Sequence, residues 1–121
     1  MKTDTFVKNA LVQDSRNKFD RYSENVDFIP EELKHFFQEY NPVDVEVVMN
    51  GNIVHFFPVE ELQKVQKEYL LGNDSFVFAS CNGDPIYLNK NNCICIRCHG
   101  LRIELEEEMA SSFCSFLELI D

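Results

Sequence analysis

The sequence predicts an α+β domain in which helices pack against a mostly antiparallel sheet of about five or six strands. Short stretches of alternating apolar and polar residues, separated by turn residues, dominate the middle of the chain and indicate hairpins. Apolar residues at helical spacing precede, interrupt and follow these stretches. The chain has 121 residues, the length of one domain, and its eleven phenylalanines without tryptophan predict a core built on Phe. We therefore expect a single domain over residues 1–121, with an N-terminal helical segment over 1–27 and a core over 28–121.

The two helices expected before the sheet differ in the clarity of their patterns. Residues Phe6 to Tyr22 show loose helical spacing, and we interpret them as one helix. The next helix is predicted to begin near Pro30, because proline suits the first turn and the two glutamates that follow complement the positive end of the helix dipole. Pro42 ends this helix. Its apolar stripe consists of Leu33, Phe36, Phe37 and Tyr40.

A hairpin and a third helix are expected next. Alternation over Val43–Met49 and Ile53–Phe57 predicts two strands, which the turn signal Asn50-Gly51 joins. Pro58, followed by two glutamates, repeats the chemistry of a helix start. The apolar face of this third helix consists of Leu62, Val65, Tyr69 and Leu70.

Further strands are expected on both sides of a second turn signal. Phe76–Ala79 and Ile86–Leu88 flank the sequence Asn-Gly-Asp-Pro, whose Asn-Gly supplies positive φ and whose aspartate caps locally. Cys93–Arg97 is a further predicted strand, and alternation continues over Leu101–Leu105. The glutamates Glu106–Glu108 are then expected at the start of a last helix, where the helix dipole favours carboxylates. The apolar face of that helix consists of Met109, Phe113, Phe116, Leu117 and Ile120.

Acidic residues are placed unevenly along the chain. The formal net charge is −10: residues 1–30 hold five basic and five acidic side chains, and residues 31–121 hold six and sixteen. A negative field repels nucleic acid and anionic membranes and speeds association with a basic partner, although it also serves solubility alone. We therefore expect no nucleic acid and no membrane among the partners. Because the first nine residues contain no apolar stretch like that of a signal peptide, we expect a cytoplasmic protein.

One cysteine-rich segment matches the patterns of haem and metal sites. Its C-x-x-C-H spacing is that of haem c attachment, and its thiols and imidazole could instead hold zinc. Haem attachment normally requires export, however, and in a strand Cys95 and Cys98 would point to opposite faces. A structural zinc site usually needs a second pair of ligands. We interpret the cysteines as small buried hydrophobic residues and expect no cofactor; the metal-ligand candidates are Cys93, Cys95, Cys98 and His99.

Candidate catalytic residues do not form a recognisable pattern. His35 is expected on the exposed side of a helix, His55 in a strand and His99 at a turn. No serine lies in a G-x-S-x-G context, and nothing marks a base beside Cys81. The glycines do not cluster into a phosphate-binding loop. We therefore expect a protein that is not an enzyme.

Four segments of the chain carry motifs in a fixed order. They read IPEELKHFF from Ile29, FPVEEL from Phe57, FVFASCNGDPIY from Phe76 and MASSFCSFLELI from Met109. Together they resemble the SUKH superfamily of the Smi/Knr type, in its opening helix, the short helix after its first hairpin, its central strand–turn–strand and its closing helix. The Asn-Gly that usually follows the first long helix is Asn-Pro in this chain.

The resemblance implies an α+β fold of the SUKH type and a role that depends on binding another protein. In bacteria, members of this superfamily are immunity proteins that bind and neutralise a cognate polymorphic toxin. A similar fungal domain belongs to a regulator of cell-wall synthesis that works through protein partners. We expect an immunity protein of a toxin–antitoxin pair; a regulatory adaptor and a cysteine-rich metal-binding protein are the alternatives.

A basic toxin domain is the partner that the resemblance to immunity proteins implies. Toxins of such systems are often basic nucleases, and carboxylates would pair with Lys and Arg around the toxin's substrate site. After Arg102 the chain has no basic residue, and its carboxylates exceed what one helix start needs. The expected partner-binding residues are Asp84, Glu104, Glu106, Glu107 and Glu108, with Asp44 and Glu46 as additional candidates.

Overall fold

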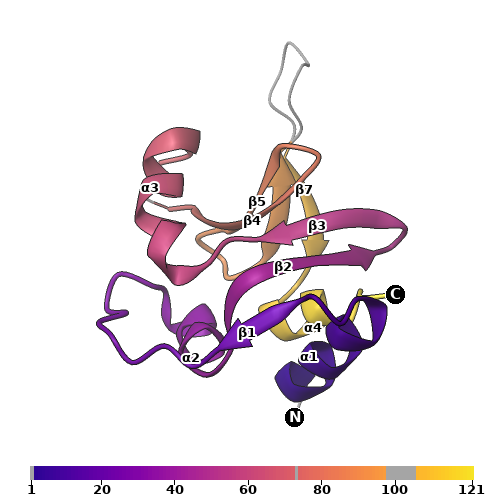
Figure 1. The fold of residues 1–121 in the computed structure, drawn as a ribbon. Helices are drawn as coiled ribbons and strands as arrows, with labels where there is room; N and C mark the ends of the chain where they lie inside the picture. The colour runs from indigo at the N-terminus through magenta and orange to yellow at the C-terminus, as the bar shows by residue number, and fades with distance from the viewer. Residues whose placement is uncertain (1, 73, 98–105) are drawn as a thin grey trace.

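One antiparallel sheet, with its strands side by side in chain order, organises the fold (Figure 1). The structure is a computed structural model that describes residues 2–72, 74–97 and 106–121. In these residues the seven strands are β1 (Lys18–Asp20), β2 (Asn41–Met49), β3 (Asn52–Phe56), β4 (Phe76–Cys81), β5 (Asp84–Leu88), β6 (Ile94–Arg97) and β7 (Glu106–Ala110). The helices in the same residues are α1 (Lys2–Gln13), α2 (Glu31–Glu39), α3 (Val59–Tyr69) and α4 (Phe113–Leu117). The α+β prediction is confirmed, and the sheet also contains β1 and β7, which were not expected as strands.

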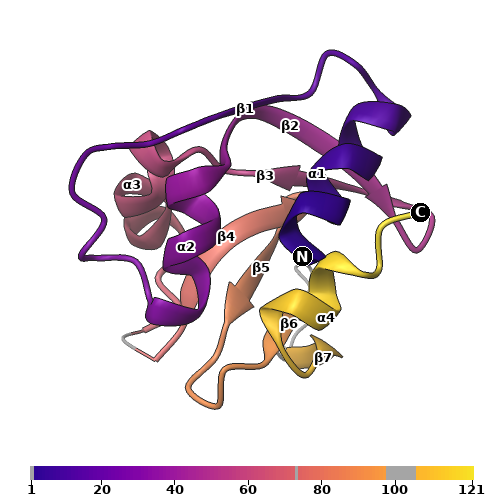
Figure 2. The ribbon, with the colours of Figure 1, turned by 90° about the horizontal axis from the view of Figure 1, so that it is seen from below.

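The two faces of the sheet carry different side chains. Helices α1, α2 and α4 lie on one side, in front of the sheet in Figure 2. Strand alternation directs Phe56, Phe78 and Ile86 toward these helices, and we call this side the core face. On the opposite side Tyr87 packs with Val65 of α3, and we call it the Tyr87 face. Residues that follow one another along a strand therefore belong to different environments.

Phenylalanine rings join the helices to the core face. The ring of Phe36 in α2 lies 6.0 Å from Phe6 in α1 and 5.2 Å from Phe113 in α4, centroid to centroid, and both pairs meet edge to face. Phe56 and Phe78 continue this cluster across the sheet, with their centroids 6.1 Å apart. Each such pair contributes about 0.5–1.5 kcal/mol beyond the burial of its area. The Phe-based core is confirmed, and α1 belongs to it through Phe6.

Two Asn-Gly turns set the registers of the hairpins on either side of α3. Asn50 and Gly51 have φ of 49° and 79°, and Asn82 and Gly83 have φ of 53° and 85°. Positive φ at both central residues matches the twist of a two-residue hairpin, and asparagine and glycine adopt it at the lowest cost. Both predicted turns are confirmed.

The helix expected from Phe6 to Tyr22 is wrong at its C-terminal half, because α1 ends at Gln13 and β1 follows. The carboxylate of Asp14 accepts a hydrogen bond from the backbone two residues later, at 2.9 Å. The side chain of Asn17 donates to a carbonyl in the last turn of α1, also at 2.9 Å. Such local bonds from Asp and Asn side chains compete with helix continuation. The chain turns here and then pairs with β2.

The expectation that Glu106–Glu108 begin the last helix is also wrong, because these residues lie on β7 and pair with β6. Helix α4 begins later, at Phe113. Its N-cap is Ser112, whose hydroxyl accepts a hydrogen bond from the backbone N–H of Ser115 at 3.1 Å. A helix dipole therefore does not account for the three carboxylates. The strand expected over Leu101–Leu105 lies outside the described residues.

Candidate binding surface

The last strand of the sheet, β7, carries three exposed glutamates. Within the described residues, β7 pairs with β6 on one side and with no strand on the other. Strand alternation places Glu107 and Met109 on the core face, and Glu106 and Glu108 on the Tyr87 face. The β7 end of the sheet is therefore negatively charged on both of its faces.

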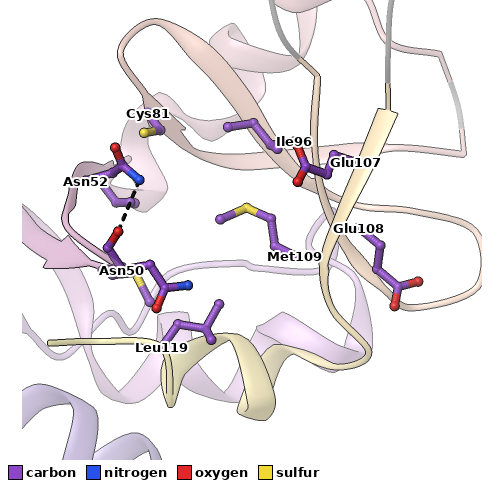
Figure 3. A pocket seen from close by; sticks show the side chains of 10 residues that line it. Asn50, Asn52, Cys81, Ile96, Glu107, Glu108, Met109 and Leu119 are labelled. Atoms are coloured by element: carbon purple, nitrogen blue, oxygen red, sulfur yellow. Dashed lines mark hydrogen bonds between the residues drawn. The ribbon is translucent and has the colours of Figure 1, made fainter.

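A pocket of 330 Å³ opens beside β7 on the core face (Figure 3). Figure 3 shows the side chains of Glu107 and Met109 directed into this pocket, whereas Glu108 points away from it on the other side of the strand. The pocket is mostly apolar, with two asparagines from the β2–β3 hairpin opposite β7. We call it the β7 groove, and it is lined by Met49, Asn50, Asn52, Val54, Cys81, Ile96, Glu107, Glu108, Met109 and Leu119.

The β7 groove combines a mostly apolar lining with the carboxylate of Glu107. Among the described residues, none forms a hydrogen bond or an ion pair with the carboxylate of Glu107. Lys and Arg side chains have apolar stems and charged ends, so they can cover apolar surface while the charged end pairs with a carboxylate. The groove therefore suits a basic side chain of another molecule.

Glu106, by contrast, is engaged within the protein. The hydroxyl of Tyr87 donates a hydrogen bond to its carboxylate. Arg97 Nη2 lies 3.8 Å from Glu106 Oε1, and its guanidinium carbon lies 5.4 Å from the centroid of the Tyr87 ring. Burial, and secondly the hydrogen bond to Glu106, raise the pKa of Tyr87 above its usual value. This arrangement fixes β7 to the sheet on the Tyr87 face.

Two cysteines have raised pKa values: Cys95, which lies in β6, and Cys93, which directly precedes that strand. Burial, followed by the charge of nearby carboxylates, raises the pKa of the Cys95 thiol to about 11. A hydrogen bond with Glu108 is the main cause that raises the pKa of Cys93. Because the thiolate is the nucleophile and the metal ligand, both shifts oppose these roles. No three His, Cys, Asp or Glu side chains in the described ranges are grouped to hold a metal ion; Cys98 and His99 lie outside those ranges.

The other predicted partner-binding residues lie in different places. Asp84 is the first residue of β5 and is paired in register with Cys81, which lines the β7 groove. Asp44 and Glu46 are exposed on β2. They line a separate pocket of 240 Å³ together with Asp14, Arg16 and Asn17. Glu104 lies outside the described residues. The predicted set therefore divides between the β7 groove and a second acidic surface that shares no lining residue with it.

One row of side chains contains the residue types of a catalytic triad. Glu46, His55 and Ser80 are neighbours in register across β2, β3 and β4. Glu46 Oε2 lies 3.9 Å from His55 Nδ1, too far for a hydrogen bond. In the described part of the chain, no hydrogen bond joins His55 to Ser80. We interpret the row as polar cross-strand neighbours, because a nucleophile and its base lie within hydrogen-bond reach.

The apolar half of the groove is what sequence reasoning missed. Met49 and Ile96 lie in predicted strands and Met109 on the apolar face of a predicted helix, but the sequence does not show which of these elements meet. The residues come from β2, β6 and β7, so their meeting depends on the order of strands in the sheet. One signal was available: if β7 is a strand, alternation puts Glu107 and Met109 on the same face.

Comparisons with known proteins do not assign a family. No model of a known protein family matches the chain, and a search of curated proteins finds no similar sequence. The SUKH resemblance stays a prediction. Within the described residues, no helix has the length and apolar character needed to cross a membrane.

Proposed function

We propose that the protein is a non-enzymatic binding domain that neutralises a toxin by covering a basic part of the toxin's surface. The observation that carries this proposal is the β7 groove, a mostly apolar pocket of 330 Å³ with the Glu107 carboxylate directed into it at the β7 end of the sheet. An anchor side chain in a pocket is the usual centre of a protein interface. A basic side chain would satisfy both the apolar lining and the carboxylate.

The charge of the whole chain supports the same partner. The net charge of −10 falls on residues 31–121, which include the groove. Complementary charge speeds encounter with a basic protein and favours the correct orientation. The resemblance to SUKH immunity proteins suggests that the basic protein is a toxin, whose substrate-binding surface the domain would cover.

Affinity capture followed by co-expression tests this proposal. The protein would be used to capture partners from the lysate of its native cell, and each toxin-like partner would be expressed with and without it. We expect the protein to restore growth. Recovery of a regulatory partner, with no rescue of growth from any partner, would instead support an adaptor.

A matched pair of charge-reversal variants tests whether the rescue of growth depends on the β7 groove. Glu107→Lys with Glu108→Lys changes the β7 edge, whereas Glu32→Lys with Glu61→Lys makes the same change of charge on exposed residues of α2 and α3. We expect the first variant to lose rescue and the second to keep it. Equal rescue by both variants would contradict a role for the β7 groove.

A further inference from the structure

We propose that the partner adds an extended basic segment to the sheet as a new strand along β7, with every second side chain directed into the β7 groove. This inference rests on the proposed function and specifies how the partner is recognised. Strand addition to an open sheet edge gains affinity from backbone hydrogen bonds and specificity from alternate side chains. The proposed strand addition requires three features: an edge strand that can accept a neighbour, a pocket beside that edge, and side chains whose charge favours a basic partner.

The first requirement is met at β7, whereas at the opposite end of the sheet side chains cover the part of β2 that extends beyond the short strand β1. Strand β1 pairs with only the first part of β2. Beyond it, the side chain of Gln13 accepts from Val48 N at 2.7 Å and donates to Val48 O at 3.0 Å. Asn17 Oδ1 accepts from Glu46 N at 2.9 Å. These amide side chains take the place of a neighbouring strand, whereas β7 has no strand among the described residues on its outer side.

The side chains of β7 specify what a new strand must carry. On the Tyr87 face it would lie beside Glu106 and Glu108, and on the core face beside Glu107 and Met109. Opposite charges on neighbouring strands stabilise the pair, and like charges destabilise it. The added strand should therefore have basic residues on the Tyr87 face. On the core face it should have apolar or basic residues, which enter the groove.

The same charges argue against a second copy of this chain as the occupant. Pairing between two β7 strands would bring the glutamates of Glu106–Glu108 from both copies together at one edge. Charged residues on an edge strand are a common means of preventing this kind of self-association. A basic strand converts the same repulsion into attraction, so the edge selects its partner by charge.

A synthetic peptide tests strand addition without changing the protein. The probe is the blocked hexapeptide Lys-Val-Lys-Val-Lys-Val, added to ¹⁵N-labelled protein and followed by amide chemical shifts and hydrogen exchange. We expect shifts at the backbone amides of Glu106–Ala110, slower exchange at the alternate amides of this strand that point away from β6, and further shifts at groove residues. The matched control is Glu-Val-Glu-Val-Glu-Val, which should not bind.

Two N-methylated versions of the peptide distinguish backbone pairing from side-chain contact. One carries N-methyl groups on the three lysines and the other on the three valines. Only one alternate set of amides faces β7 in a sheet, so one version should bind roughly tenfold more weakly than the parent and the other within roughly twofold. Equal loss, or no loss, for both versions would overturn strand addition.

Other outcomes would also overturn the proposal. These are no binding at millimolar peptide, shifts centred on Asp44 and Glu46, and protection of β7 that rises with protein concentration alone, which would identify a second copy as the occupant. The growth-rescue assay is independent of the peptide. If rescue depends on Glu107 and Glu108 while the peptide tests fail, the protein-binding function stands and only the strand addition is wrong.

Discussion

The two ends of the sheet differ in what keeps their strands from pairing with another molecule. At the β2 end, the side chains of Gln13 and Asn17 form hydrogen bonds with the strand's backbone. At the β7 end, within the described residues, the protection consists of exposed carboxylates. Hydrogen bonds close an edge, whereas charge leaves it open to a partner of opposite sign. Changes at the β2 end should therefore alter stability, and changes at the β7 end should alter binding.

The largest effect on stability is expected when the amides at the β2 end are removed. The carbonyls of Ala10 and Val48 each keep a hydrogen bond from a backbone N–H. In Gln13→Ala with Asn17→Ala, however, the backbone N–H groups of Glu46 and Val48 lose their acceptors. Leaving these groups unsatisfied should lower the free energy of unfolding by about 2–4 kcal/mol, because Asn17 is buried. Urea denaturation at neutral pH measures this change. A loss below about 0.5 kcal/mol would show that water replaces the side chains at little cost.

An intermediate effect is expected at high pH from Cys95, which lies on β6 behind the β7 edge. Its folded pKa of about 11 is above the ordinary value of 9.0, so the folded state holds the proton more tightly than the unfolded state. The stabilisation is complete below about pH 9 and is lost as pH rises toward 11. The free energy of unfolding should fall by about 2 kcal/mol over this range from this group.

Denaturation of Cys95→Ser from pH 8 to 11 checks the assignment, because serine does not titrate there. The variant should show a flatter dependence on pH than the original protein. Some slope should persist, because the pKa values of Cys93 and Tyr87 are raised as well. Identical slopes for the two proteins would show that folding does not raise the pKa of Cys95.

The smallest effect on stability is expected at the β7 edge. Glu107→Gln with Glu108→Gln should change the free energy of unfolding by less than about 0.5 kcal/mol, because both side chains are exposed. The same denaturation experiment measures it. A loss as large as that of the Gln13 and Asn17 variant would mean that these carboxylates hold the fold together and are not reserved for a partner.

The parts of the fold that depend on local chemistry could be predicted from the sequence. The turns at Asn50-Gly51 and Asn82-Gly83 and the helix α2 follow from their own residues, and the structure confirms them. Glu106–Glu108 fit a helix start equally well by local rules, and only their pairing with β6 makes them a strand. Local patterns do not contain this contact.

The candidate site was predicted only in its charged part, for the same reason. The sequence identified Glu107 and Glu108 as exposed carboxylates, but most of their apolar neighbours in the groove come from β2, β3, β4, β6 and the end of the chain. The sequence also grouped these carboxylates with Asp44 and Glu46, which line a different pocket. Surface patches form from residues that are distant in sequence, so charge counts alone do not separate one patch from another.

The most direct test of the central claim is the association rate of the captured toxin with the two charge-reversed proteins at low and high salt. We predict that Glu107→Lys with Glu108→Lys slows association roughly tenfold and weakens its dependence on salt, because the complementary field at β7 is lost. Glu32→Lys with Glu61→Lys, which makes the same change of charge elsewhere, should leave the rate within roughly threefold of the original. If both variants slow association equally, the overall charge attracts the partner and the β7 edge is not its binding surface.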